Sequence, residues 1–184
     1  MSEGRRPLWL SDLYPSKQLL PHLIRYCHEG APPEGYAMPD PYEIAREFAY
    51  EFGRFEYALK RSGFLLTKAA DARADWRKFA TALGDAFFAD VRDSGIAPTI
   101  LVHPPRKLMQ DGLKWMPEQP PPITNVVDLM EKGVCRIRNS YLHGEKFTGG
   151  PDGAQWNRDT LLVAEAMAVL LAAHDRVPAV RALL

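Results

Sequence analysis

The sequence predicts an all-α fold, a helical bundle of four to five main helices. The first observation is the placement of its 16 prolines, because seven lie in residues 7–41 and seven in 98–122, leaving proline-free blocks at 42–97, 123–150 and 152–177. An interior proline removes a backbone donor and clashes with the preceding turn, so helices are expected inside these blocks. The second observation is that apolar residues recur there every three or four positions, which is the helical period.

The first proline-free block is long enough for two helices. One is predicted over residues 42–62, with a stop at Gly63, because glycine favours helix ends. Its apolar stripe consists of Ile44, Phe48, Phe52, Phe55 and Leu59. The other is predicted over 71–93 and ends at Ser94-Gly95. Its stripe consists of Trp76, Phe79, Leu83, Phe87 and Val91.

Two further long helices are predicted in the remaining blocks. The third covers about 123–143, with a stripe of Val127, Met130, Val134, Ile137 and Tyr141. The fourth begins near Asn157, where an Asn N-cap lies between Trp156 and Leu161 at the spacing of a hydrophobic staple. It continues through Leu162, Ala166, Val169 and Ala173. A short additional helix is expected around residues 16–28.

The chain is expected to form a single domain over residues 1–184. Residues 1–41 are an N-terminal extension or an extra helix, and residues 95–122 are a proline-rich insert. This insert is long for a connection in a bundle, which indicates either a packed loop or a functional one. Strand-like alternation is confined to the short stretch 99–103.

Composition narrows the classes of protein. The 184 residues are 46% apolar and carry 23 Lys plus Arg against 23 Asp plus Glu, as expected for an ordinary soluble domain. Zero formal net charge argues against a globally basic nucleic-acid-binding surface but permits a local basic site. No apolar run reaches the roughly 18 residues of a membrane span, and the N-terminus lacks the apolar core of a signal peptide. A cytoplasmic protein with reduced thiols is therefore expected.

No metal or cofactor is predicted. The sequence has two cysteines, Cys27 and Cys135, and together with His28 they do not make a convincing zinc set, because zinc normally takes four ligands that commonly include close Cys or His pairs. Glycine-rich phosphate loops and G-x-S-x-G elbows do not occur.

The polar face of the third helix carries the residues that point to chemistry. Opposite the core stripe lie Asp128, Lys132, Arg136, Asn139 and His143, and Arg138 lies at the edge between the two faces. His143 precedes Gly144 at the end of the helix, where the dipole favours the protonated imidazole, whereas the neighbouring arginines favour the neutral form. Such opposed influences permit titration near neutral pH, as a general acid or base requires.

Arg138, Asn139 and His143 are spaced so that they can act together. Asn139 and His143 are i and i+4 neighbours, so the amide can orient the imidazole ring, and the long Arg138 side chain can partly close the gap to the histidine. Together the three side chains can hold one phosphate. On spacing alone, a solvated basic helix face remains the rival interpretation.

Arg138-Asn139-x-x-x-His143, late in a helix of an all-α domain, resembles the signature of the HEPN superfamily. The extended block 134–147 is its most specific part. Two further stretches resemble one prokaryotic branch, namely Phe55-Glu56-Tyr57-Ala58-Leu59-Lys60 followed by Gly63-Phe64, and Pro104-Pro105-Arg106-Lys107 running to Asp111-Gly112 and Trp115. The similarity covers most of residues 42–175 and leaves out the N-terminal forty.

The resemblance implies a HEPN-like helical bundle that forms a homodimer, in which two motifs face each other. Such proteins are often metal-independent endoribonucleases with toxin or defence roles. It also implies that His143 transfers protons, that Arg138 contacts phosphate and that Asn139 supports the site. The expected partners are an RNA substrate and an antitoxin or tethering protein. A relative is regulated by modification of a Tyr two positions beyond the motif His, where this chain has Glu145.

Further residues could support the site. Glu56 could pair with Arg138 or lend polar support, and an exposed glutamate one turn from Lys60 is an equally open interpretation. Lys60 of the first resembling stretch, and Arg136, Tyr141 and Lys146 of the block 134–147, are also candidates for support. Two other function classes remain open. One is a non-catalytic module that binds a nucleotide, RNA or an acidic protein, and the other is a structural helical partner whose polar face sets dimer register.

Overall fold

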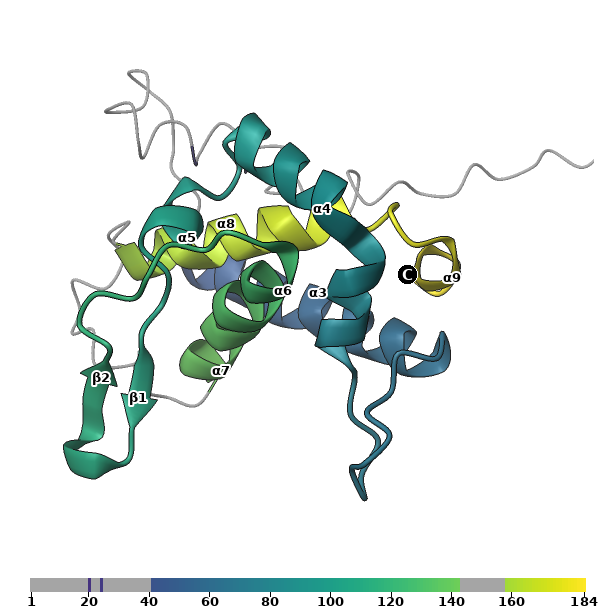
Figure 1. Ribbon diagram of the computed structural model, residues 1–184, viewed down its shortest axis with the longest axis horizontal. Helices are drawn as coiled ribbons and strands as arrows, with labels where there is room; N and C mark the ends of the chain where they lie inside the picture. The colour runs from purple at the N-terminus through teal and green to yellow at the C-terminus, as the bar shows by residue number, and fades with distance from the viewer. Residues whose placement is uncertain (1–19, 21–23, 25–40, 143–157) are drawn as a thin grey trace, which may run out of the picture.

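The computed structural model describes Leu20, Ile24, residues 41–142 and residues 158–184, and it is mostly helical (Figure 1). The all-α class is therefore confirmed. The helical elements are α3 (Pro41–Arg61), α4 (Trp76–Ser94), α5 (Pro98–Val102), α6 (Val126–Asp128), the π-helical η2 (Leu129–Val134), α7 (Cys135–Leu142), α8 (Arg158–Ala173) and α9 (Pro178–Arg181). A two-stranded sheet joins β1 (Lys107–Met109) to β2 (Lys114–Met116) through the 3-10 turn η1 (Asp111–Leu113). Within this described part, every helix is too short or too polar to cross a membrane.

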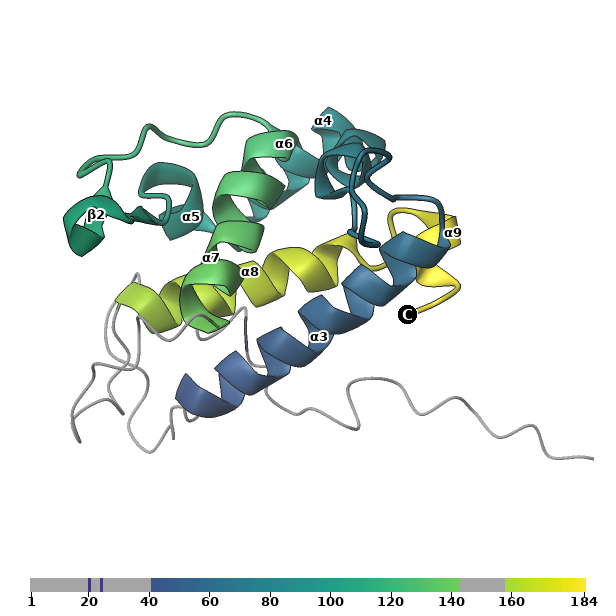
Figure 2. The same cartoon turned by 90° about the horizontal axis from the view of Figure 1, so that it is seen from below.

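Helix α8 is the central element of the bundle. The predicted stripe Leu162, Ala166, Val169 and Ala173 is buried, but burial extends around almost the whole helix and includes Thr160 and Glu165. α3 packs along one side of α8, while α5, α7 and η2 pack on others, as the two orthogonal views show (Figures 1 and 2). The apolar stripe predicted a helix buried on one face, whereas α8 is buried on almost all of its faces. Its proposed cap at Trp156 and Asn157 lies outside the described residues.

Helix α3 follows the prediction closely. It runs over Pro41–Arg61, and every member of its predicted apolar stripe is buried. The chain leaves the helix through Gly63, whose φ of +85° is a conformation that L side chains rarely adopt, and the N–H of Phe64 donates to the carbonyl of Leu59 at 2.9 Å. The glycine stop is thus confirmed.

Helix α4 starts later than predicted, at Trp76 instead of residue 71. The carboxylate of Asp75 accepts the N–H of Lys78 at 2.8 Å and forms the N-cap. Before it, residues 64–75 form a loop closed by a bridge between Leu65 and Ala74. The stripe of α4 is buried as expected, and the helix ends at Gly95, although Gly84 interrupts it with non-helical backbone.

The third predicted helix is observed as α6, η2 and α7 in succession. It begins at Val126, where the Asn125 side chain accepts the N–H of Asp128 at 2.8 Å. The π turn alters the periodicity, so that Val126 and Leu129 are buried and the predicted core residue Val127 is only half-buried. Met130, Val134 and Ile137 are buried as predicted. The side chain of Tyr141 lies outside the described residues.

The proline-rich insert is folded. The stretch 99–103, where the sequence alternates like a strand, is mostly helix α5. The strands form instead at β1 and β2, where Lys107 is paired with Met116 and Met109 with Lys114. The N–H of Ile123 donates to the carbonyl of Leu101 at 2.8 Å and closes the insert. Ala97, Thr99, Ile100, Pro104 and Pro105 of the insert are buried, whereas most of residues 106–122 are exposed, so the choice between a packed and a functional segment stays open. From the predicted helix 16–28, Leu20 and Ile24 are described, and both are helical and buried.

A buried carboxylate joins the insert to the core. Glu165 on α8 is fully buried, and its side chain accepts the backbone N–H of Thr99 at 3.1 Å and that of Ile100 at 2.8 Å. These are N–H groups of the first turn of α5, which have no acceptor within that helix. These two backbone donors at a helix N-terminus stabilise a carboxylate.

The Glu165 contact can be tested by Glu165→Gln. The amide keeps the shape but loses the charge and adds a buried N–H₂ group, so we expect the free energy of unfolding to fall by about 2–4 kcal/mol. The measurement is urea denaturation, with Glu43→Gln on the exposed first turn of α3 as the control. Equal stabilities of the two variants would contradict the assigned role.

Two helical glycines offer a matched test of the packing. A Cβ added at Gly133 would lie 2.8 Å from Cγ2 of Ile100, whereas one added at Gly53 on α3 would meet no atom within 4 Å. Gly133→Ala is expected to destabilise the fold by about 1–3 kcal/mol through overpacking. Gly53→Ala should stabilise it by about 0.5–1 kcal/mol, since glycine loses more backbone entropy in a helix. Thermal unfolding distinguishes these outcomes, and a stabilising Gly133→Ala would refute the close approach of η2 to α5.

Candidate functional site

Arg138 on α7 lies between its own helix and α3. Its guanidinium carbon is 5.3 Å from the centroid of the Phe52 ring, a cation–π arrangement. One terminal nitrogen donates to the Oδ1 atom of Asn139 at 3.1 Å. The Nε atom is buried and has no hydrogen-bond partner in the described part of the chain. Among the described residues, no carboxylate forms an ion pair with this half-buried guanidinium.

Arg136 and Asn139 face the insert. The guanidinium of Arg136 donates to the carbonyl of Pro105 at 3.3 Å. Both side chains line a pocket of about 450 Å³, together with Lys107, Trp115 and Ser140. The polar face predicted for this helix is therefore divided, with Arg138 toward α3 and Arg136 toward the hairpin, while Asn139 joins the two sides through its bond to Arg138.

The remaining polar-face residues have different surroundings. Asp128 and Lys132 form an ion pair with each other at 2.9 Å. His143 and Lys146 lie outside the described residues, and Tyr141 is described only as part of the helix. The relation of the imidazole to Arg138 is therefore still a prediction.

Glu56 and Lys60 are both half-buried on α3. Neither of the two pairings considered for Glu56 is formed, since within the described part of the chain it makes no ion pair with Arg138 or with Lys60. Glu56 does lie close enough to Cys135 on α7 to influence its thiol. It can therefore add negative potential near the motif without neutralising Arg138 through direct contact.

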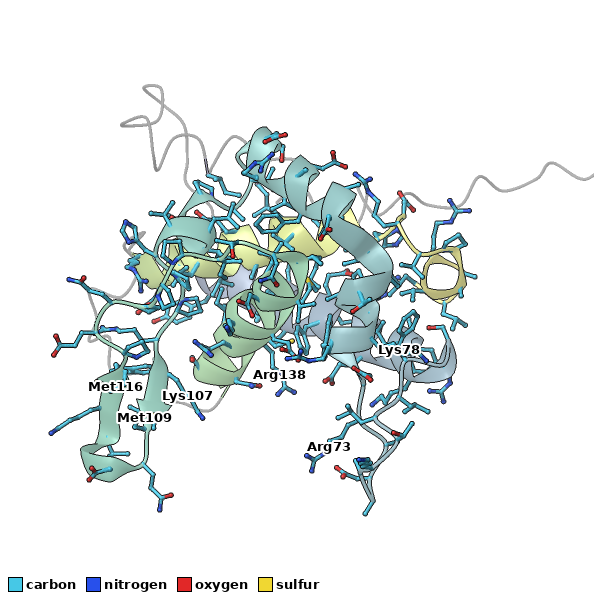
Figure 3. All side chains as sticks on the ribbon, viewed as in Figure 1. Arg73, Lys78, Lys107, Met109, Met116 and Arg138 are labelled. Carbon is cyan, nitrogen blue, oxygen red and sulfur yellow. The ribbon has the colours of Figure 1, made fainter. Side chains whose placement is uncertain are left out.

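Two projections flank the exposed end of α7. The β1–β2 hairpin and the loop 64–75 extend from the same side of the molecule, with Arg138 between them (Figures 1 and 3). The hairpin presents Lys107, Met109 and Met116, all exposed, and the loop presents Arg73, which pairs with Asp71 at 2.8 Å.

Two residues near the candidate site were not predicted from the sequence to have a role there. Phe52 was assigned to the core stripe, and although it is buried there, its ring also supports Arg138. Arg106 was noted within a resembling stretch but given no role, and it lines a pocket with Arg158. Periodicity cannot separate a packing aromatic from one that also holds a guanidinium, since both recur at the same spacing.

Cys135 is surrounded by the charges of this region. Burial raises the pKa of its thiol far above the ordinary value, and the nearby carboxylates of Glu131 and Glu56 raise it further, against a smaller opposite effect of Arg138. The thiol therefore stays protonated at neutral and mildly alkaline pH. Thiolate chemistry by this residue is accordingly disfavoured.

This protonation state predicts slow alkylation. In a Cys27→Ser variant, which leaves Cys135 as the single thiol of the chain, we expect native protein at pH 8 to react with iodoacetamide about 100-fold more slowly than denatured protein. Mass spectrometry of timed samples gives both rates. Comparable rates in the two states would show that Cys135 is exposed and ionisable.

Within the described residues, no group of three or more His, Cys, Asp or Glu side chains is placed to hold a metal ion. Comparisons of the chain with models of protein families, with curated proteins and with solved structures found no match.

Proposed function

We propose that this protein is a metal-independent endoribonuclease of the HEPN type, acting as a homodimer in a toxin or defence role. The observation that carries the proposal is Arg138, a half-buried guanidinium that is supported by Phe52 and Asn139 and has no carboxylate partner among the described residues. It belongs to the stretch Arg138-Asn139-x-x-x-His143, which resembles the HEPN signature.

Phosphate fits the environment of Arg138. A guanidinium presents planar N–H donors that match two phosphate oxygens, and contact with an aromatic face limits the orientations it can adopt. The bond to Asn139 restricts it further, so less entropy is lost when the phosphate binds.

The proposed reaction uses the 2′-hydroxyl of the RNA as the nucleophile. Its oxygen attacks the adjacent phosphorus while a neutral His143 accepts its proton, and the bond from phosphorus to the 5′-oxygen breaks as that oxygen receives a proton from a protonated imidazole. The products are a 2′,3′-cyclic phosphate and a 5′-hydroxyl. Arg138 stabilises the negative charge that develops on the phosphorane oxygens.

The dimer follows from the number of histidines that the reaction needs. A single imidazole cannot be both the base and the acid in one step, so His143 of the partner subunit supplies the second proton-transfer group. Two copies of Arg138 then flank the same phosphate. Because the chain has no formal net charge, its general attraction for RNA is weak, and an antitoxin or tethering protein is the expected means of control or delivery.

The proposal is tested by RNA cleavage in the presence of EDTA. Wild-type protein is expected to cleave mixed RNA, and His143→Ala and Arg138→Ala are each expected to reduce the rate by about 100-fold or more, since they remove proton transfer and charge stabilisation respectively. The control is Arg92→Ala, which removes the same charge from the end of α4, where Arg92 pairs with Asp93 at 2.8 Å.

Three results would contradict the proposal. Loss of cleavage on chelation would exclude the metal-independent mechanism, and full activity of His143→Ala would exclude the histidine. A monomer by light scattering would exclude the composite site. Salt-sensitive RNA binding that Arg138→Ala weakens, without strand scission at any protein concentration, would assign the protein instead to the non-catalytic binding class.

A further inference from the structure

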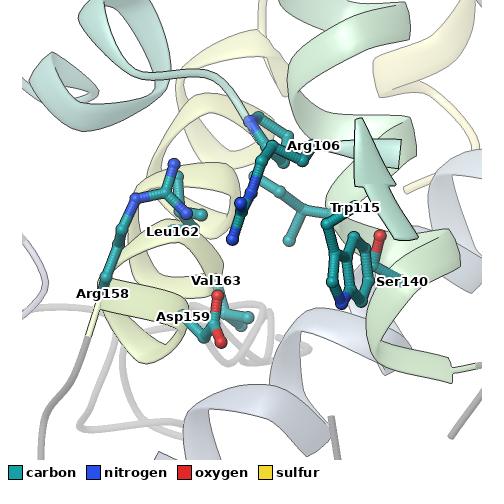
Figure 4. Close-up of a pocket in the computed structure, with 9 residues that line it drawn as sticks. Arg106, Trp115, Ser140, Arg158, Asp159, Leu162 and Val163 are labelled. Carbon is teal, nitrogen blue, oxygen red and sulfur yellow. The ribbon is translucent and has the colours of Figure 1, made fainter. Parts of the chain in front are cut away.

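A second pocket, outside the HEPN-like motif, lies where the insert meets α7 and α8. Its volume is about 170 Å³, and its walls come from three parts of the chain: the segment before β1 together with Trp115 of β2, α7, and the first turns of α8. In the view of Figure 4, Arg106 and Arg158 stand on one side of the pocket and Trp115 and Ser140 on the other. The pocket thus combines cationic, aromatic and hydroxyl groups.

Neither arginine of this pocket forms an ion pair with a described residue. Arg158 donates to two neutral backbone carbonyls, that of His103 at 2.8 Å and that of Pro104 at 3.3 Å, which hold it in place without cancelling its charge. Arg106 is exposed and makes no hydrogen bond or ion pair with a described residue. Two guanidiniums at one pocket repel each other, and an anion between them would relieve that repulsion.

The interior of the pocket is suited to a flat ring. Ile137, Leu162 and Val163 provide apolar surface, and the indole of Trp115 provides an aromatic wall. Polar groups occur at the edge, where Ser140 offers a hydroxyl and Asp159 a carboxylate. An apolar slot with polar groups at its edge matches a nucleobase, which has apolar faces and hydrogen-bonding edges.

The volume of the pocket indicates which size of base fits best. A cavity of roughly 150 Å³ is known to hold one benzene ring, so a pocket of about 170 Å³ accommodates a single six-membered ring. A purine has two fused rings and would extend from the slot toward the open side of the pocket. The ligand of best fit is therefore a single-ring base that carries an anionic group.

We propose that this pocket binds a pyrimidine ribonucleotide, with the base in the slot and its phosphate between Arg106 and Arg158. If the nucleotide is part of an RNA strand that the protein cleaves, the inference rests on the function proposed above. Binding of the free nucleotide is independent of that function. The pocket of about 450 Å³ that contains Asn139 shares Trp115 and Ser140 with this one. A strand anchored here by a pyrimidine can therefore continue toward the Arg138 motif.

The test is calorimetric titration of the full chain with UMP, CMP, AMP and inorganic phosphate. UMP and CMP should bind, and AMP and phosphate should bind at least about tenfold more weakly, because the purine of AMP extends from the slot and phosphate lacks a ring. Arg106→Ala should weaken UMP binding by about tenfold or more through loss of a charged contact. Because Arg106 is exposed and has no partner in the described chain, this variant should fold normally, which thermal melting checks.

One control removes an equal charge elsewhere: Arg92→Ala should leave UMP binding unchanged. Absence of UMP and CMP binding, or binding that Arg106→Ala does not weaken, overturns the pocket assignment while leaving the nuclease proposal intact. Binding of AMP as tight as that of UMP overturns the size argument.

Discussion

The arrangement of this protein depends on the buried carboxylate of Glu165. It is carried by α8, the helix with the most extensively buried surface, and it accepts the first N–H groups of α5. The two N–H donors of α5 stabilise the carboxylate at that depth and fix the orientation of α5 against α8. The start of the insert is thereby attached to the centre of the bundle.

From this attachment follows the position of both candidate sites. The chain leaves α5 through His103 and Pro104, whose carbonyls accept the guanidinium of Arg158, and then forms the hairpin that covers one side of α7. The close approach of Gly133 to Ile100 brings η2 against the same short helix. The pocket between insert, α7 and α8 is a consequence of how these elements meet, and it lies beside the face that carries Asn139.

Arg138 illustrates how packing prepares a polar group for binding. The aromatic side chains Phe52, Phe55, Trp76 and Phe79 contact one another between α3 and α4, and Phe52 presents its ring to the guanidinium. The arginine is thus held by core residues while its charge stays unpaired within the described chain. Because an aromatic ring stabilises a cation without neutralising it, attraction for an anion is preserved.

Local sequence determined the helices, their apolar faces and the motif Arg138-Asn139-x-x-x-His143, because proline placement, capping residues and helical periodicity act over a few neighbouring residues. The tertiary structure decided what those signals do not encode. The π turn at η2 moved Val127 partly out of the core, the hairpin formed within a segment that had no strand pattern, and the face of α7 was divided between α3 and the insert. Each of these depends on contacts between residues far apart in the chain, which a local pattern cannot specify.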